Sequence, residues 1–321
     1  MIKIKNFTAT DKEFQELCKI DNLVNHDSID HPDDDKNNWK NRDKSLFRDR
    51  LLLYKDNKLI GVIYFSQGRG KNNRTCFYTL NLNPKYNNNG YRKLLYKAML
   101  KEVEKINCNL IHTSIYDHPN YIEHKKLLDE ENFTLVQINR EYSCDIRKIN
   151  FLKYKPLIKK LELEDINFYD SKNEMKNWPN HYKKLEELTW KYEKDIPIPN
   201  NIHRHRESFD QFLKNQLDYK KNYYAVEIIA VKNEHYIAST DLEYYPKSEP
   251  HKAWTGSLGV LRQYRRKGIA TALKIKAMEK LLQKGITEIR TDNEENNPMY
   301  KINEKLGFKS VPSSMDYSKK I

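Results

Sequence analysis

The sequence predicts an α/β protein built from two copies of one domain, each a mixed, mostly antiparallel sheet flanked by helices. Two stretches that open amphipathic helices, residues 86–95 and 264–273, share a pattern about 178 positions apart. The same spacing relates the ends of two apolar runs, at 111–113 and 289–291. A repeat that keeps its frame over this length indicates a duplicated domain.

Length and composition set the broad class. A chain of 321 residues has room for two domains of about 150 residues, which the repeat places at 1–150 and 151–321. Hydrophobic residues make up 38% of the chain, and no run approaches the roughly 18 apolar residues of a spanning helix. The start of the chain lacks a signal-peptide core, and the cysteines lack metal-type spacing. We therefore expect a cytoplasmic protein without membrane contact, disulfides or a metal.

The formal net charge of +13 exceeds what one small anionic ligand requires. An acidic partner such as RNA therefore stays open. Lysines are scattered through every segment rather than gathered into a footprint, so nucleic acid is not the favoured partner.

The second copy gives the clearest order of elements. In chain order we expect a strand near 157–163, helices at 180–194 and 209–217, strands at 225–231, 236–245 and 251–261, a helix from 268 to 285, a strand at 286–291, a helix from 298 and a last strand.

Local signals justify these elements. Leu185, Leu188 and Tyr192 recur at helical spacing, and Ser208 begins a capping-box pattern. The turn at 232–235 joins two strand patterns as a hairpin. On the later helix Leu273, Ala277, Leu281 and Leu282 share one face, and Gly285 ends it.

A basic turn at 264–268 leads from the apolar run 251–261 into that helix. The first backbone N–H groups of a helix have no internal partner, and the helix dipole adds favourable potential for an anion there. Gly268 and Ala270 present no bulky side chain to block the approach. The turn therefore predicts a phosphate-binding loop.

The segment Arg265-Arg266-Lys267-Gly268-Ile269-Ala270 resembles the pyrophosphate loop of the GNAT superfamily of N-acetyltransferases: Arg or Gln, two residues, Gly, one residue, then Gly or Ala. Residues 291–308 resemble the acetyl-CoA-binding strand and helix of that family. Together with the repeat, the whole chain resembles a tandem acetyltransferase, an arrangement that the mycothiol synthases share. The resemblance implies two tandem acyl-CoA N-acyltransferase (GNAT) domains that use acetyl-CoA, with no metal.

The resemblance also implies which residues hold coenzyme A. The loop amides up to Thr271 would bind the pyrophosphate, with the Thr271 hydroxyl as an extra donor. Leu258, Gly259 and Val260 would lie along the pantetheine arm. Asn293 and Asn297 match positions of polar cofactor contacts in the family, with capping of the helix near Pro298 as the alternative for both.

Asn303 stands where many members of the family have a Tyr that protonates the departing thiolate. Asn cannot supply a titrating proton, so we count Asn303 among the cofactor contacts. Tyr300, three residues earlier, is a candidate acid, with a packed surface aromatic as the alternative. Protonation by solvent would also serve.

An amine nucleophile must lose a proton, so a base is expected near the strand ends. Asp241 and Glu243 share one face of the predicted strand 236–245. Glu243 is the preferred base because it lies nearer the end that faces the loop. An exposed edge carboxylate is the alternative.

The first copy is a degenerate version of the second. Gly90 survives, but Arg92 takes the place of Ala270, where it would crowd a pyrophosphate or itself fill the empty pocket. Asn132-Phe133 replaces the pair Gly307-Phe308 that ends the segment 291–308 of the second copy. The first copy would stabilise the second copy through packing and form one wall of a cleft for the acceptor. The acidic tract at 25–35 lacks a complete ligand pattern, so it is expected to be a solvated loop or a lip that attracts a cationic acceptor. The tract at 203–206 lacks a third ligand and is expected to be a basic loop near the second helix.

The leading function is an N-acetyltransferase in which a primary amine, carried by a small molecule, attacks acetyl-CoA directly at the second copy. Backbone N–H of Leu258 or Val260 would stabilise the oxyanion. One alternative keeps the fold and takes the acyl group from aminoacyl-tRNA, which the positive charge favours and the coenzyme A loop opposes. Another is a non-enzymatic module that binds acyl-CoA or RNA.

Overall fold

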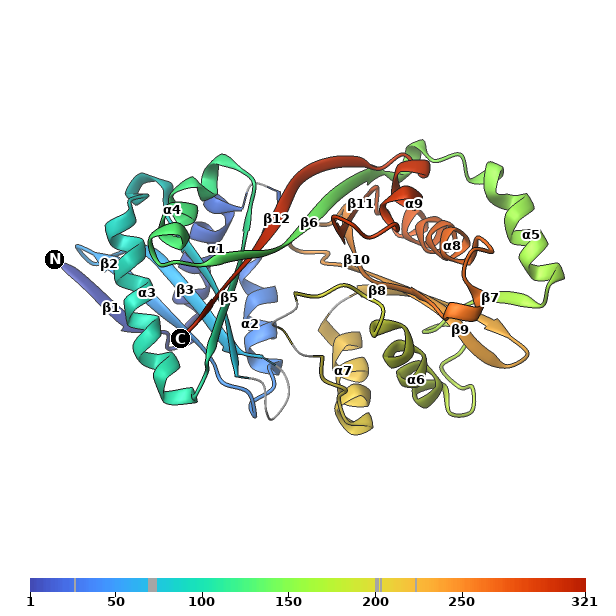
Figure 1. The fold of residues 1–321 in the computed structure, drawn as a ribbon, viewed down its shortest axis with the longest axis horizontal. Helices are drawn as coiled ribbons and strands as arrows, with labels where there is room; N and C mark the ends of the chain where they lie inside the picture. The colour runs from blue at the N-terminus through green and yellow to red at the C-terminus, as the bar shows by residue number, and fades with distance from the viewer. Residues whose placement is uncertain (26, 69–73, 200–201, 203, 223) are drawn as a thin grey trace. The chain divides into compact units, whose positions relative to one another are not determined.

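The computed structural model describes residues 1–25, 27–68, 74–199, 202, 204–222 and 224–321, and it divides into two compact units (Figure 1). Unit 1 contains Met1–Arg140, Ile198–His205 and Pro312–Ile321. Unit 2 contains Glu141–Pro197 and Arg206–Val311. These units overlap the predicted halves 1–150 and 151–321 without coinciding with them, because the last residues belong to unit 1.

The sheet of unit 1 has the strand order β1-β2-β3-β4-β5-β12, where β12 is Lys309–Lys320, and only the β4–β5 pair is parallel among its described strands. The elements of the first copy, in chain order, are β1 (Ile2–Asn6), α1 (Asp11–Val24), α2 (Pro32–Asn41), β2 (Arg48–Lys55), β3 (Lys58–Gln67), β4 (Thr75–Leu82), α3 (Asn89–Val103), β5 (Leu110–Tyr116), α4 (Ile122–Glu130) and β6 (Thr134–Asp145).

Unit 2 repeats this plan with the strand order β7-β8-β9-β10-β11-β6, in which β10 and β11 are parallel. The elements of the second copy are α5 (Lys155–Leu163), β7 (Ile166–Asp170), α6 (His181–Glu193), α7 (Phe209–Asn222), β8 (Tyr224–Lys232), β9 (His235–Tyr244), β10 (Lys252–Val260), α8 (Ile269–Gln283), β11 (Glu288–Glu294), α9 (Tyr300–Lys305) and β12 (Lys309–Lys320).

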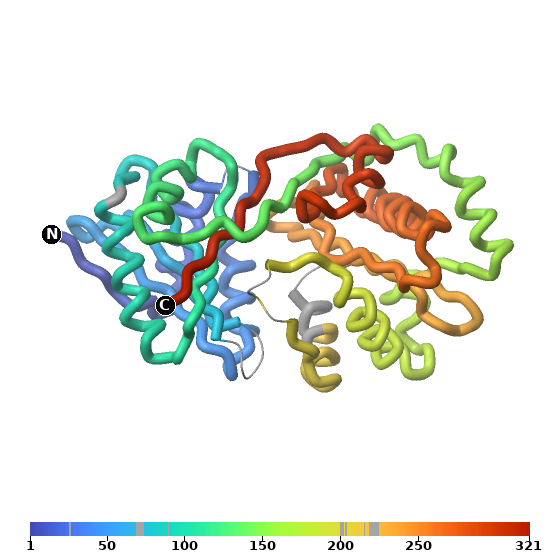
Figure 2. The backbone as a smooth tube through the Cα atoms, viewed as in Figure 1, coloured from blue at the N-terminus to red at the C-terminus, as the bar shows by residue number. Residues whose placement is uncertain are grey.

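The last strand of the second copy belongs to the sheet of unit 1, and the end of the last strand of the first copy belongs to the sheet of unit 2. β12 comes from the second copy, yet its residues Ser314–Lys320 pair with β5 in unit 1 (Figure 2). The end of β6, from Glu141, neighbours β11 in unit 2. There Ser143 donates a hydrogen bond to Glu288, 2.7 Å from Oγ to Oε1. Neither unit is therefore one continuous stretch of chain.

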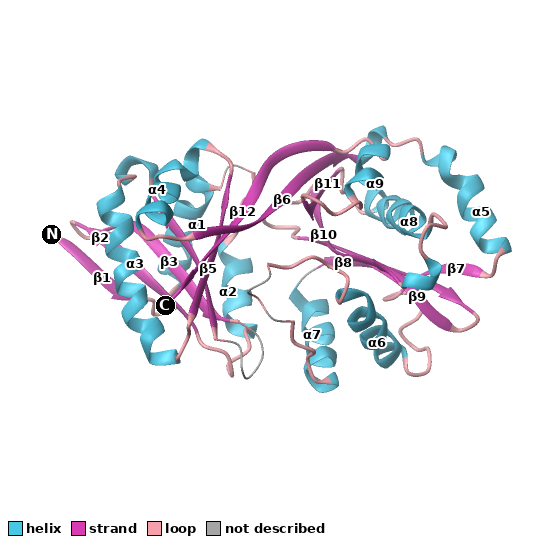
Figure 3. Ribbon diagram, viewed as in Figure 1, coloured by secondary structure: helices cyan, strands magenta, loops and turns pink. Residues whose placement is uncertain are grey.

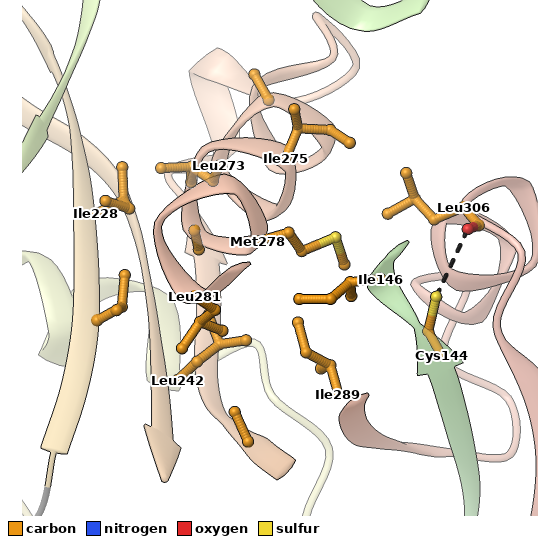
Figure 4. Close-up of a cluster of buried hydrophobic side chains, with 14 of the residues drawn as sticks. Cys144, Ile146, Ile228, Leu242, Leu273, Ile275, Met278, Leu281, Ile289 and Leu306 are labelled. Carbon is orange, nitrogen blue, oxygen red and sulfur yellow. Dashed lines mark hydrogen bonds between the residues drawn. The ribbon is translucent and has the colours of Figure 1, made fainter. Parts of the chain in front are cut away.

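Each sheet carries helices on both faces (Figure 3). In unit 1, Phe14 and Leu17 of α1 pack on one face, and Leu95 of α3 with Leu127 of α4 pack on the other. In unit 2, the buried side of α8 lies against Ile228, Leu242 and Ile289 (Figure 4). Tyr192 and the leucines of α6 cover the opposite face. These two faces carry different parts of the candidate site.

Most predicted elements of the second copy are present. Leu273, Ala277 and Leu281 are buried on α8 as their spacing predicts, and Gly285 follows the helix with a φ of +83°. Ser208 accepts the Gln211 N–H at 3.3 Å before α7.

The strand predicted near 157–163 is wrong, because this segment is helix α5. Pro156 lies in its first turn, and Ile158 and Leu161 are buried three residues apart between lysines, which is helical rather than strand spacing. The strand itself is β7, three residues later.

The acidic tract at 25–35 is not wholly a loop. From Pro32 it forms α2, with Asp33, Asp34 and Asp35 in the first turn, where carboxylates favour the helix dipole. In the basic tract, His203 lies outside the described residues, and Arg206 forms an ion pair with Glu186 at 2.7 Å. Within the described part of the chain, no helix is both long and apolar enough to span a membrane.

Candidate active site in unit 2

β10 separates from β11 after a short parallel pairing. In the described structure, Lys252–Trp254 pair with Glu288–Arg290, whereas β10 stays paired with β9 as far as Val260. The edge of β10 that faces β11 therefore has no strand partner beyond Trp254 among the described residues. Leu258, Gly259 and Val260, the predicted pantetheine contacts, lie on this stretch.

The loop before α8 presents an open helix N-terminus. Gly268 is the N-cap residue with a φ of +89°, and α8 has no side-chain cap. The Ala272 N–H is the first to bond within the helix, to the Gly268 carbonyl at 3.0 Å. The preceding N–H groups, from Ile269 to Thr271, thus have no helical partner. This is the anion-binding arrangement that the sequence predicts for residues 265–271.

The basic side chains of this loop are engaged differently from one another. Arg265 donates from Nε to the Val260 carbonyl at 2.9 Å, and Arg265 and Arg262 both bond Asp195, just after α6. The pKa of Asp195 falls to about 2 because Arg262, and then Arg265, stabilise its charge. Lys267 lies 3.6 Å from Glu164, and Arg266 is exposed with a φ of +66°. Arg265 therefore ties the loop to α6 rather than extending toward the helix N-terminus.

Two carboxylates converge on a bulge in β10. Gly256 is the extra residue of the bulge, since Thr255 pairs with Leu242 and Ser257 with Asp241. A Cβ atom on Gly256 would lie 2.0 Å from Asp241 Oδ2 and 3.2 Å from Glu243 Oε1. Both carboxylates therefore face one backbone position, and they can approach it only because residue 256 has no side chain.

Each of these carboxylates also has one oxygen held by a hydroxyl. Ser257 Oγ donates to Asp241 Oδ1, and the Tyr245 hydroxyl donates to Glu243 Oε2 at 3.2 Å. Burial raises the pKa of both carboxyl groups above the ordinary value. The Asp241 and Glu243 oxygens beside Gly256 can bind an ammonium group and accept its proton.

A hydroxyl network extends from Asp241 to α6. The Tyr192 hydroxyl lies 3.0 Å from Ser257 Oγ and accepts a bond from Ser239 at 3.2 Å. The Tyr192 ring covers Gly259, where a Cβ atom would lie 2.0 Å from the ring. Burial raises the pKa of Tyr192 to about 12, so its hydroxyl stays protonated at neutral pH.

The predicted polar residues after β11 have distinct surroundings. Asn303 is 1% exposed and donates from Nδ2 to Asn293 Oδ1 at 2.7 Å, and its own Oδ1 has no partner among the described residues. Asn297 accepts the Met299 N–H at 3.1 Å, a capping contact before α9. Tyr300 packs, partly buried, against the core beneath α8.

The corresponding loop in unit 1 is closed by its own side chains. Asn88 caps α3 by accepting the Tyr91 N–H at 3.0 Å, and Gly90 lies inside the helix rather than at its cap. Arg92 is 2% exposed and donates to Asn87 Oδ1 at 2.6 Å. The amides that are open in α8 are therefore partly occupied in α3.

The other face of unit 1 is filled as well. Asn81 lies about 178 positions before Gly259 and replaces it with a side chain. Its Nδ2 bonds Asp21 of α1 at 2.7 Å, and the Tyr64 hydroxyl bonds the same carboxylate at 2.5 Å. In unit 1 a buried network thus occupies the position that corresponds to Gly259, which the Tyr192 ring covers in unit 2.

Sequence reasoning missed several residues of this constellation. Gly256, a lone glycine inside a strand pattern, is a recognised signal for a bulge. Tyr192 was predicted only as a packing residue, and no spacing rule connects Ser257 or Asp195 with the loop. These contacts join segments more than 15 residues apart, which periodicity within one element does not reveal.

Residues 14–125 and 183–308 each match the acetyltransferase (GNAT) family, so the match covers most of both copies. The chain belongs to this family. Two tandem GNAT domains, each a mixed sheet flanked by helices, are thereby confirmed. A search of the curated proteins returns no match.

Among solved structures, a tandem GNAT protein from the clavulanic acid biosynthesis pathway is similar with a TM-score of 0.78 and 13% identity, covering 100% of this chain and 98% of that chain. A GCN5-related N-acetyltransferase from Sphaerobacter thermophilus has a TM-score of 0.70 and 13% identity, covering 99% and 95%. At these identities the likeness concerns the tandem GNAT fold alone.

Proposed function

We propose that unit 2 is an N-acetyltransferase that transfers the acetyl group of acetyl-CoA to the primary amine of a small molecule. The observation that carries the proposal is the convergence of Asp241 and Glu243 on Gly256, beside the unpaired edge of β10. A positively charged amine is the group that two such carboxylates attract.

The residues of unit 2 fit coenzyme A. Its pyrophosphate would meet the open amides from Ile269 to Thr271, next to Gly268, which has no side chain. Its pantetheine arm would pair with the backbone of Leu258–Val260. Asn303, whose Oδ1 is buried without a described partner, offers an acceptor to an amide of that arm.

Acetyl-CoA supplies the acetyl group as an activated thioester, and the protein supplies the proton acceptor and the oxyanion donor. Glu243 takes the proton from the acceptor ammonium, so that the neutral nitrogen attacks the thioester carbonyl carbon. Asp241 would hold the ammonium group near Gly256 before this transfer, and the second N–H proton, which the nitrogen must lose after the attack to give the amide, would pass to solvent. Backbone N–H of Leu258 or Val260 stabilises the developing oxyanion. The thiolate leaves with a proton from solvent, and Tyr300 is the alternative donor.

Free-thiol release from acetyl-CoA in the presence of an amine library tests the transfer. Thiol release with an amine, and acetylated product by mass spectrometry, supports it. Binding without turnover would favour a sensor of acyl-CoA, and turnover only with charged tRNA would favour the aminoacyl-tRNA route.

Calorimetry with coenzyme A tests the assignment to unit 2. We expect one site per chain, because Asn88 and Arg92 close the loop of unit 1. Two equivalent sites would contradict the assignment.

A further inference from the structure

The hydrogen bonds around Tyr192 have one consistent direction when Asp241 is ionised. Ser257 gives its single hydrogen to Asp241, so its oxygen can only accept from Tyr192. The Tyr192 oxygen in turn accepts from Ser239. The hydroxyls of Ser239, Tyr192 and Ser257 thus form a donor chain that ends on the Asp241 carboxylate, and each bond polarises the next.

The same tyrosine is fixed at two further points of the proposed coenzyme site. Its ring covers Gly259, on the stretch of β10 that has no partner toward β11. Its carbonyl accepts the N–H of Asp195 at 2.9 Å, and Asp195 bonds Arg262 and Arg265 of the loop. A shift of Tyr192 would therefore displace the loop before α8, the edge of β10 and the Asp241 carboxylate together.

The charged groups that face Asp241 come from three other positions. Lys172, after β7, stabilises its charge. Glu227 of β8 pairs with Asp241 in register, and Glu243 lies two residues away on the same face. Burial opposes ionisation of Asp241, while the hydrogen bonds from Ser257 and the charge of Lys172 favour it.

We propose that Tyr192 is a positioning residue that acts through Ser257 to keep the Asp241 carboxylate oriented and ionised for the acceptor amine. This role rests on the proposed function, because it assigns Asp241 to the acceptor site. The hydroxyl of Tyr192 acts on the Asp241 carboxylate through Ser257, and its ring packs over Gly259 at the edge of β10.

Tyr192→Phe tests the proposal because it removes the hydroxyl and keeps the ring. Burial already raises the pKa of Asp241 in the folded state above that in the unfolded state. Such a group stabilises the fold least once pH has risen through the folded-state pKa. Losing the donor chain raises the folded-state pKa of Asp241 further. Tyr192→Phe therefore lowers the free energy of unfolding through Asp241 at neutral pH, and this loss vanishes at about pH 4 or below.

We therefore expect the loss of Tm caused by Tyr192→Phe to be about 2 °C larger at pH 7 than at pH 4. In an Asp241→Asn background this pH dependence should disappear, since the titrating group is gone. Tyr182→Phe, on the same helix but outside the network, is the matched control and should show no such difference.

Kinetics supply the second readout. The acidic limb of kcat/KM against pH should move upward by about half a pH unit in Tyr192→Phe, with coenzyme A affinity within about twofold. Equal losses of Tm at both pH values, together with an unmoved limb, would reduce Tyr192 to a packing residue. Absence of transferase activity in the wild type would sink the proposed function instead, while the Tm comparison would still decide the donor chain.

Discussion

Glu243 combines a proton-accepting oxygen with an environment that makes it a better base. One oxygen faces Gly256 and the other is bonded by Tyr245. Burial raises its pKa, which strengthens it as a base when it is ionised. The same shift means that the carboxyl group becomes protonated, and useless as a base, at a higher pH than an exposed glutamate.

Glu243→Gln should lower kcat by about 10²-fold or more, with coenzyme A affinity nearly unchanged. The loss should be largest at the acidic end of the range in which Glu243 is ionised, because the acceptor amine is then mostly protonated. Wild-type activity should itself fall as pH drops through the raised pKa. Steady-state kinetics over a range of pH measure both effects.

The exposed Glu234, on the turn between β8 and β9, provides the matched control. Glu234→Gln should leave kcat unchanged. A loss below about threefold in Glu243→Gln across the pH range would refute the assignment, and Asp241→Asn would be the next variant to measure.

Tyr300→Phe should keep nearly full activity. Tyr300 packs against the core beneath α8, and one helical turn separates it from Asn303, where the family places its acid. Solvent then protonates the thiolate. A tenfold loss of kcat, about 1.4 kcal/mol of barrier, with unchanged coenzyme A affinity would instead identify Tyr300 as the acid.

The N-termini of α8 and α3 differ in whether their backbone N–H groups are open to a phosphate, and one pair of glycine substitutions tests this difference. Gly268→Ala forces an alanine into a φ of +89° and places its Cβ 2.7 Å from Leu157. The left-handed conformation costs an alanine about 1–2 kcal/mol, so the loop should leave it and the N–H groups of Ile269–Thr271 should lose their alignment; we expect coenzyme A to bind at least about tenfold more weakly. Calorimetry measures the affinity.

Gly90→Ala is the matched change in the first copy. Gly90 lies within α3, and a Cβ on it would lie 3.3 Å from Asn88 Oδ1. Coenzyme A affinity should be unchanged, while Tm shifts slightly. Equal effects of the two substitutions on affinity would show that the loop of unit 1 also binds the coenzyme.

The sequence was sufficient for the parts of the fold that depend on local pattern. The repeat, the face of α8 and the open loop before it follow from spacing and from Gly268. The prediction of a strand at 157–163 is wrong because a short apolar run does not distinguish a strand from a helix. The Tyr192–Ser257–Asp241 chain was not predictable, since it depends on the register of β9 against β10 and on the bulge at Gly256.

The last strand, β12, should contribute much of the stability of unit 1. Tyr317 of β12 is 5% exposed and packs in the core beneath α3. Tyr317→Ala should destabilise unit 1 by about 3 kcal/mol, as for other buried aromatics. Hydrogen exchange should become faster in β5, its pairing partner, and stay unchanged in α8.

Ile321→Ala, at a half-exposed neighbouring residue, serves as the control and should leave exchange in β5 unchanged. Protection of β5 that survives Tyr317→Ala would show that β12 contributes little to unit 1.

The exchange of β6 and β12 also sets an order of events on the ribosome. Domains usually complete in the order in which they are synthesised. Here unit 2 has all its strands once β11 has emerged, because β6 is made early. Unit 1, although its first strands are translated first, keeps an open edge at β5 until residues 314–320 are added. The nascent chain therefore carries an unpaired strand edge, a site for aggregation or chaperone binding, through most of its translation.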